Sequence, residues 1–267
     1  MFGILEEKNR LLMEKERIEG IAYFDPMLND RSIEKEDVEF PLPTHKLVLE
    51  NKKFPYNTFA TLMVNSNYGG LNNHLEKGNF KNYLYDNKME DVMDFLKQLE
   101  SDGAKVTNKR TVERHIKTIL DLGLDLMEVR NTDKGIVYML KSSIDNKYYV
   151  KIPYAQIREL LISTNKNMLK LFAFMKYMCN ETDFKTIDRK FIAEHIGISS
   201  KSVKNLDGIS TMLHSLANLG FIEIMETVKV EGSANGKKSV KTILSYRLCT
   251  LEEYKGAKGR GRIKKSK

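Results

Sequence analysis

The chain of 267 residues contains no tryptophan, only two cysteines and only five histidines. Cys179 and Cys249 lie far apart in the sequence, so we expect two half-buried thiols rather than a disulfide. The histidines show no metal-ligand spacing with either cysteine. We therefore expect no metal site and no cofactor.

The sequence also lacks a long apolar run and a signal peptide. No hydrophobic stretch approaches the length needed to span a bilayer. Glu6, Glu7 and Lys8 lie where a signal peptide requires continuous apolar residues. These absences predict a cytoplasmic protein with no membrane partner.

Patterns that indicate catalysis are missing as well. There is no His-x-His pair of the kind that a rolling-circle nuclease uses to bind a metal ion, so Tyr83 and Tyr85 are expected to be packing residues. Clustered acidic residues for two-metal chemistry are not evident. The segment 232–239 lacks the spacing and the strand-to-helix position of a phosphate-binding loop. We expect a protein that is not an enzyme and has no catalytic residues.

The positive charge is concentrated at the C-terminus. The formal net charge is +8, and seven basic residues with no acidic residue lie within 255–267. Only one excess positive charge remains for residues 1–254. The composition of this tail predicts disorder. It suits non-specific contacts with phosphates, and the alternative is a segment that only keeps the chain soluble.

A helix-turn-helix pattern begins at Asp188. A first helix is expected at 189–195, a turn at 196–199 and a second helix from about Ser200. Ala193 is small enough for two helices to cross closely, Gly197 suits a left-handed turn, and Val203 is expected to pack back against the first helix. In proteins with this pattern, the second helix enters the DNA major groove.

Two strands follow this pattern and complete a winged helix. They are expected at 221–230 and 239–248, joined by a Gly- and Lys-rich tip at 231–238. The helical segment before them is long, and Asp207-Gly208 is a candidate break within it.

The first half of the chain shows the same order of elements. Amphipathic helices at 89–99 and 108–122 precede short strands at 126–130 and 135–140. In both halves the second helix ends at a Leu-Gly pair, which is Leu122-Gly123 in the first half and Leu219-Gly220 in the second. We infer a tandem repeat.

The predicted fold class is α+β, mainly helical, with two winged helix-turn-helix domains in tandem. The expected boundaries are 1–41 for a short N-terminal helix and connector, 42–143 for the first domain, 148–254 for the second, and 255–267 for a disordered basic tail. A strand at 46–49 is expected in the first domain, and a strand at 148–153 with helices at 155–163 and 166–179 in the second. The N-terminal helix, at 4–19, is compatible with packing on the core or with dimerisation.

A strand that ends in Pro153, a helical core, a helix-turn-helix and a basic wing, all preceded by a similar module, resemble the tandem winged-helix replication initiators of plasmids and phages. The resemblance covers about 42–254 and is most specific at 188–248. It implies binding of double-stranded DNA at repeated origin sequences through both modules. It also implies a homodimer and host replication proteins as partners, and in some members repression of the protein's own promoter. The long second recognition segment departs from the family pattern.

The candidate DNA contacts are basic or polar residues on the second helix and the hairpin of each half. In the first half they are Lys105, Lys109, Arg110, Arg114, Lys117, Arg130 and Lys134. In the second half, the resemblance assigns Lys201, Ser202, Lys204 and Asn205 to the recognition helix and Lys237 and Lys238 to the wing, with Lys241 beside them. Lys201 and Asn205 are four residues apart and share a helix face, and their side chains suit guanine and adenine edges. The Ser200 hydroxyl suits a helix start, which also favours a phosphate.

Two alternative functions stay open. One is a winged-helix transcriptional regulator, although the lack of a ligand-binding domain favours an initiator over a metabolite-responsive regulator. The other is a protein–protein adaptor in replisome assembly, for which we expect a neutral or acidic recognition face with exposed apolar residues. Both recognition segments carry basic residues, so DNA binding is the leading prediction.

Overall fold

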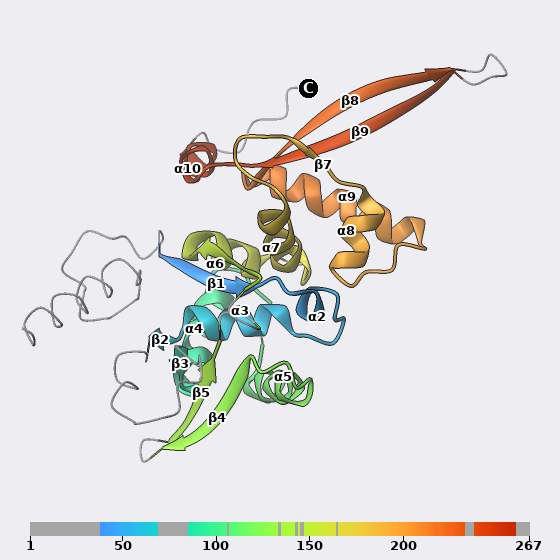
Figure 1. Ribbon diagram of the computed structural model, residues 1–267. Coiled ribbons are helices and arrows are strands. Elements are labelled where there is room, and N and C mark those ends of the chain that lie inside the picture. The colour runs from blue at the N-terminus through green and yellow to red at the C-terminus, as the bar shows by residue number, and fades with distance from the viewer. Residues whose placement is uncertain are drawn as a thin grey trace, which may run out of the picture. The chain divides into compact units, whose positions relative to one another are not determined.

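The chain folds as an α+β protein in which about half of the described residues are helical and the sheets are small and antiparallel (Figure 1). The computed structural model describes residues 38–68, 85–105, 107–132, 135–141, 144, 147–163, 165–232 and 238–259. The helix expected at 4–19 lies outside these residues. The chain divides into two compact units: unit 1 comprises Met1–Pro43 and Pro55–Thr164, and unit 2 comprises Thr44–Phe54 and Asn165–Lys267.

Among its described residues, unit 1 contains a four-stranded antiparallel sheet, a separate pair of strands and four helices. In chain order these are β1 (Glu39–Pro43), α3 (Tyr56–Val64), β2 (Asn67–Tyr68), β3 (Tyr85–Asn87), α4 (Met89–Ser101), α5 (Lys109–Asp121), β4 (Met127–Thr132), β5 (Gly135–Leu140), β6 (Tyr149–Pro153) and α6 (Tyr154–Ile162). The larger sheet has the order β2-β3-β5-β4, and β1 pairs with β6.

The core of unit 1 forms where the apolar faces of its helices meet. Phe59 and Leu62 of α3 are fully buried, and α5 buries Val112, Ile116 and Ile119 at helical spacing. Each of these side chains contributes about 2 kcal/mol by leaving water. The expected helices at 89–99 and 108–122 and the expected hairpin are therefore confirmed in kind, with ends shifted by one or two residues.

Unit 2 contains a three-stranded antiparallel sheet and five helices among the described residues. These are α2 (Lys46–Leu49), α7 (Met168–Met178), β7 (Lys185–Thr186), α8 (Arg189–His195), α9 (Val203–Asn218), β8 (Ile222–Gly232), β9 (Lys238–Leu248) and α10 (Leu251–Gly259). The sheet order is β7-β9-β8. The helix α7 is apolar on most sides and is buried from Met168 to Met175.

The two units repeat one order of elements. In each, a core helix is followed by a strand, two helices and a hairpin, and this strand pairs with the second strand of the hairpin; unit 1 has the additional short strand β2 before it. This pairing joins β3 to β5 in unit 1 and β7 to β9 in unit 2. Both second helices end at the expected glycines, because Gly123 and Gly220 adopt positive φ angles of 61° and 77°.

The division between the units differs from the expected boundary at residues 143–148. The strand β1 pairs with β6 from Glu39↔Pro153 to Pro43↔Tyr149, and Arg158 of α6 bonds to Asp102 at 2.6 Å. The strand and the helix that were expected to open the second domain therefore belong to unit 1. Two strands that are so distant in sequence leave no pattern in their local residues that would predict their pairing.

The segment 46–49 is a helix of unit 2, and the expected strand was wrong. The backbone N–H of Leu47 donates to His45 Nδ1 at 3.3 Å, so His45 caps the helix start. Val48 and Leu49 are buried, whereas Leu47 is 50 % exposed. An apolar run of this length suits a strand and a helix equally, and tertiary packing decides between them.

The long helix of unit 2 is not divided at Asp207-Gly208, because α9 is continuous from Val203 to Asn218. The candidate break was therefore wrong. Ile209, Leu213 and Leu216 lie on its buried face. Their burial exceeds the cost of about 1 kcal/mol that glycine imposes in a helix interior.

The expected disordered tail is helical in its first part, because α10 extends to Gly259. Tyr254 is 2 % exposed and its ring lies 5.0 Å from that of Phe221. A Cβ on Gly220 would lie 2.9 Å from the Cβ of Ala257, so α10 crosses the α9–β8 corner closely. The aromatic contact holds a segment that its composition alone would leave unfolded, while residues 260–267 lie outside the described part.

Candidate nucleic-acid interface

The exposed side of α5 carries four of the predicted site residues. Arg110, Arg114 and Lys117 occupy positions i, i+4 and i+7, opposite the buried row of that helix, and we call them the basic face of α5. Lys109 is exposed at the helix start and Lys105 just before it. Within the described part of the chain, none of these five cations forms an ion pair.

The position of α5 is fixed by its cap and by His115. The Thr111 N–H donates to Asn108 Oδ1 at 2.9 Å. His115 Nδ1 lies 2.6 Å from Thr58 Oγ1 on α3. Burial, and secondarily the Arg114 charge, lower the pKa of His115. The neutral imidazole therefore holds α5 against α3 while the arginines on the other side stay in water.

The β4–β5 hairpin contributes less positive charge than expected. Arg130 is half-buried and its Nε donates to Glu128 Oε1 at 3.0 Å. Both residues point to the same side of β4, because side chains two apart in a strand share a face. Arg130 is therefore partly neutralised within the hairpin, and Lys134 lies outside the described residues.

The turn between α8 and α9 has the expected left-handed glycine. Gly197 has a φ of +75°, and a Cβ there would lie 2.4 Å from the Glu50 carbonyl oxygen. Ala193 is fully buried, as close helix crossing requires. Val203, however, is 75 % exposed, so its predicted packing against α8 was wrong. The turn extends through Ser202, and Val203 becomes the outward first residue of α9.

Two of the predicted contact residues at this turn, Ser200 and Asn205, form side-chain hydrogen bonds within the protein. The Ser200 hydroxyl donates to Glu194 Oε1, and Asn205 Nδ2 donates to the Ser199 carbonyl at 2.9 Å. Ser202 occupies the cap position of α9 without a side-chain cap bond. Lys201 and Lys204 are exposed, and neither forms an ion pair with any described residue.

The outer face of α9 is polar, with one lysine and one aspartate that balance each other. Its exposed residues at helical spacing are Lys204, Asp207, Thr211, His214 and Asn218. Asp207, Thr211 and His214 were missed by the sequence analysis. The helical spacing of Ile209, Leu213 and Leu216 was sufficient to find them, because the residues opposite an apolar row face solvent.

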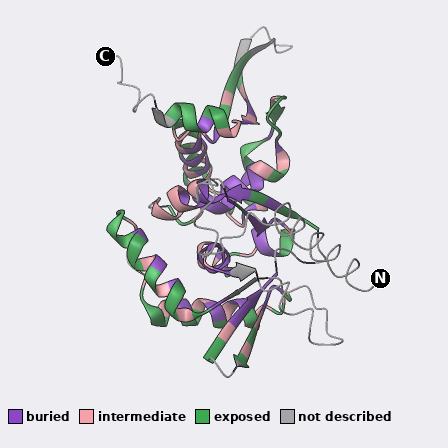
Figure 2. Ribbon diagram, turned by 90° about the vertical axis from the view of Figure 1, so that its left-hand side faces the viewer, coloured by how far each residue is buried: buried purple, intermediate pink, exposed green. Residues whose placement is uncertain are grey.

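The β8–β9 hairpin extends beyond the helices of unit 2 (Figure 1). Residues Glu226 to Val228 of β8 are exposed in succession, so neither face is covered there (Figure 2). Further out, the backbone register pairs Lys229 with Lys241 and Gly232 with Lys238. Lys237 lies outside the described residues.

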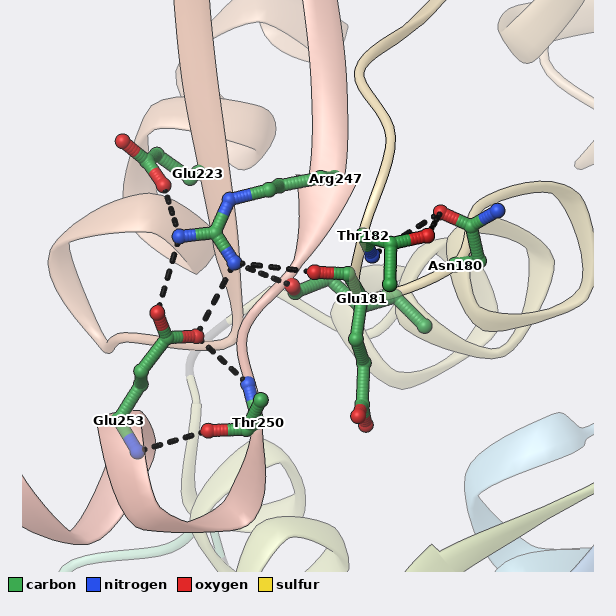
Figure 3. A network of polar contacts seen from close by, with 8 residues as sticks. Asn180, Glu181, Thr182, Glu223, Arg247, Thr250 and Glu253 are labelled. Atoms are coloured by element: carbon green, nitrogen blue, oxygen red, sulfur yellow. Dashed lines mark hydrogen bonds and ion pairs between the residues drawn. The ribbon is translucent and has the colours of Figure 1, made fainter.

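The base of this hairpin is held by Arg247 (Figure 3). Its guanidinium forms an ion pair with Glu223 of β8, donates to Glu253 of α10 at 2.9 Å and donates to the Glu181 carbonyl at 3.2 Å. The hydrogen bond to Arg247 is the main cause that lowers the pKa of the Glu253 carboxyl. Arg247 is therefore a structural cation that joins α10 to the hairpin.

Other kinds of site have no support within the described ranges. No group of three or more His, Cys, Asp or Glu side chains there is arranged to hold a metal ion, and both cysteines are free thiols. None of the helices described has the length and the apolar character that a membrane crossing requires. Comparison of the chain with protein-family models, curated proteins and solved structures gave no match.

Proposed function

We propose that this chain is a sequence-specific double-stranded DNA-binding protein built from two winged helix-turn-helix units. The observation that carries the proposal is the basic face of α5, whose cations have no partner among the described residues. Solvated arginines on a helix that precedes a hairpin suit phosphate and guanine contacts. The repeated order of elements supports a second, equivalent surface formed by α9, β8 and β9.

Within this function, we propose the initiation of replication on a plasmid or phage. The support is the resemblance in element order and the presence of two modules in one chain. Partners would be origin DNA, a second copy of the chain and host replication proteins. A transcriptional regulator is the alternative. Footprinting separates them, because an initiator would protect several repeats, each with groove faces about 10 bp apart.

The test of DNA binding uses the full chain and a random-sequence duplex pool. We expect the wild-type chain to select a defined sequence from the pool. The double variant Arg110→Gln with Arg114→Gln should bind the selected duplex at least about tenfold more weakly, at a cost of about 1 kcal/mol for each lost contact. The control variant Lys97→Gln with Lys151→Gln removes the same charge from other exposed positions of unit 1. Selection of no sequence by the wild-type chain would refute the proposal.

A specific observation favours a second candidate, a protein–protein adaptor, for unit 2. The outer face of α9 carries one lysine and one aspartate together with the exposed apolar side chain of Val203, and Phe191 of α8 is also exposed. A balanced, partly apolar face suits a protein partner. If only unit 1 variants alter DNA binding and every α9 variant leaves it unchanged, the adaptor function applies to unit 2.

A further inference from the structure

Gly208 lies in the interior of α9, at a position where the fold does not need glycine. Its φ is not in the left-handed region, and a Cβ added there would meet no atom within 4 Å. Glycine is among the least favourable residues for a helix interior. The described part of unit 2 therefore offers no structural reason for it. Glycine is also used where a partner approaches a backbone closely.

The side of α9 that holds Gly208 is also poor in charge. Lys204 lies one turn before Gly208 and Asp207 is adjacent, and the helix contains no other Lys, Arg, Asp or Glu. The helix α5 differs, because four cations face two acids there. Contacts made by α9 would therefore release few counterions, whereas those made by α5 would release several.

We propose that Gly208 is a specificity-determining position at which α9 approaches the base-pair edges of the major groove too closely for any side chain. This inference rests on the proposed DNA binding and assigns a different contribution to binding to each unit. In this division, α5 supplies salt-dependent affinity for phosphates, and the close contact of α9 supplies sequence selectivity. DNA is favoured over a protein partner by Lys201 and Lys204, which are exposed beside and at the start of α9 and form no ion pair with any described residue.

The test compares Gly208→Ala with Gly256→Ala in the full chain. Gly256 lies within α10, is exposed, and likewise leaves room for a Cβ. Each substitution should raise the melting temperature of unit 2 by about 4 °C, because alanine favours the helix. Only Gly208→Ala should lower the ratio of affinities for the selected duplex and a random duplex, by at least about tenfold, with random-duplex affinity and salt slope unchanged. Gly208→Leu should lower this ratio further.

The outcomes separate the inference from the function on which it rests. If the wild-type chain selects no duplex, DNA binding itself fails. If the wild-type chain selects one and Gly208→Ala retains the affinity ratio within twofold, DNA binding stands and the close approach at Gly208 is refuted. Equal losses for selected and random duplexes would also refute it, because the contact would then be to phosphates. Opposite effects of one methyl group on stability and selectivity would support it.

Discussion

His115 couples the stability of unit 1 to pH. Burial lowers its pKa, so the unfolded chain takes up a proton at a higher pH than the folded chain does. The stabilisation of the folded state by neutral His115 is complete above the pKa of the unfolded chain, which is about 6.5. It is lost as the pH falls through the folded value. We expect the melting temperature of unit 1 to fall below pH 6.5, and His115→Gln to weaken this dependence. A histidine C–H resonance that titrates at an unshifted pKa would contradict the argument.

Lys170 is a second residue with a pH effect, in unit 2. It is 4 % exposed, its Nζ donates to the Asn51 carbonyl at 3.1 Å, and burial lowers its pKa to about 8. Between pH 8 and the ordinary lysine value of 10.5, Lys170 is protonated in the unfolded chain only, so the free energy of unfolding rises with pH. The rise is on the order of 3 kcal/mol at most. Denaturation at several pH values should show it in the wild type and in Lys166→Met, but not in Lys170→Met.

The α8–α9 turn depends on the absence of a side chain at Gly197. Gly197→Ala would combine a left-handed φ with a collision against the Glu50 carbonyl, so we expect unit 2 to lose about 3 kcal/mol or more. Gly123→Ala is the matched control, because its φ is +61° and a Cβ there meets no atom within 4 Å. It should cost about 1 kcal/mol in unit 1. Chemical denaturation measures both, and equal losses would show that the close contact is unimportant.

At the scale of elements, α10 is an integral part of unit 2. Its Tyr254 is buried on Phe221, which in turn lies 4.9 Å from Phe172 of α7. We expect Tyr254→Ala to lower the free energy of unfolding of unit 2 by about 3 kcal/mol. Glu252→Ala, on the exposed side of the same helix, should change it by less than about 0.5 kcal/mol. Limited proteolysis should then cut the Tyr254→Ala chain near residue 250 first.

This anchoring changes how the basic tail is best tested. Truncation after residue 254 would remove most of α10. The helix that positions Glu253 for its ion pair with Arg247 would then be lost. A loss of DNA binding by the truncated chain would therefore confuse folding with charge. Substitutions beyond Gly259 in the full chain avoid the difficulty.

At the scale of the whole molecule, the tail and the two units should contribute different kinds of binding. We expect replacement of Arg260, Arg262, Lys264, Lys265 and Lys267 by Gln to weaken all duplexes alike. The slope of log affinity against log salt should become shallower by up to about 4.5, since each of the five phosphate contacts contributes about 0.9. Selectivity between the selected and the random duplex should not change. Fluorescence anisotropy titrations at several salt concentrations measure both, and an unchanged slope would show that the tail does not touch DNA.

Much of the fold follows from local patterns. The apolar spacing of Val112, Ile116 and Ile119 predicts the helix α5. The turn at Gly123 marks the end of α5, and the turn at Gly220 marks the end of α9. These features depend on neighbours within a few residues, so they are present in the sequence itself. The same spacing also places the basic face of α5 in solvent.

Only the tertiary structure decided the remainder. The β1–β6 pairing, the transfer of 44–54 to unit 2 and the continuity of α9 through Gly208 all depend on contacts between distant segments. The hydrogen-bond partners of individual polar side chains were also decided by the tertiary structure. Arg130 donates to Glu128, and Asn205 donates to the Ser199 carbonyl. A sequence determines which faces are apolar, because periodicity is local, whereas the partner of each face depends on loop closure and packing over the whole chain.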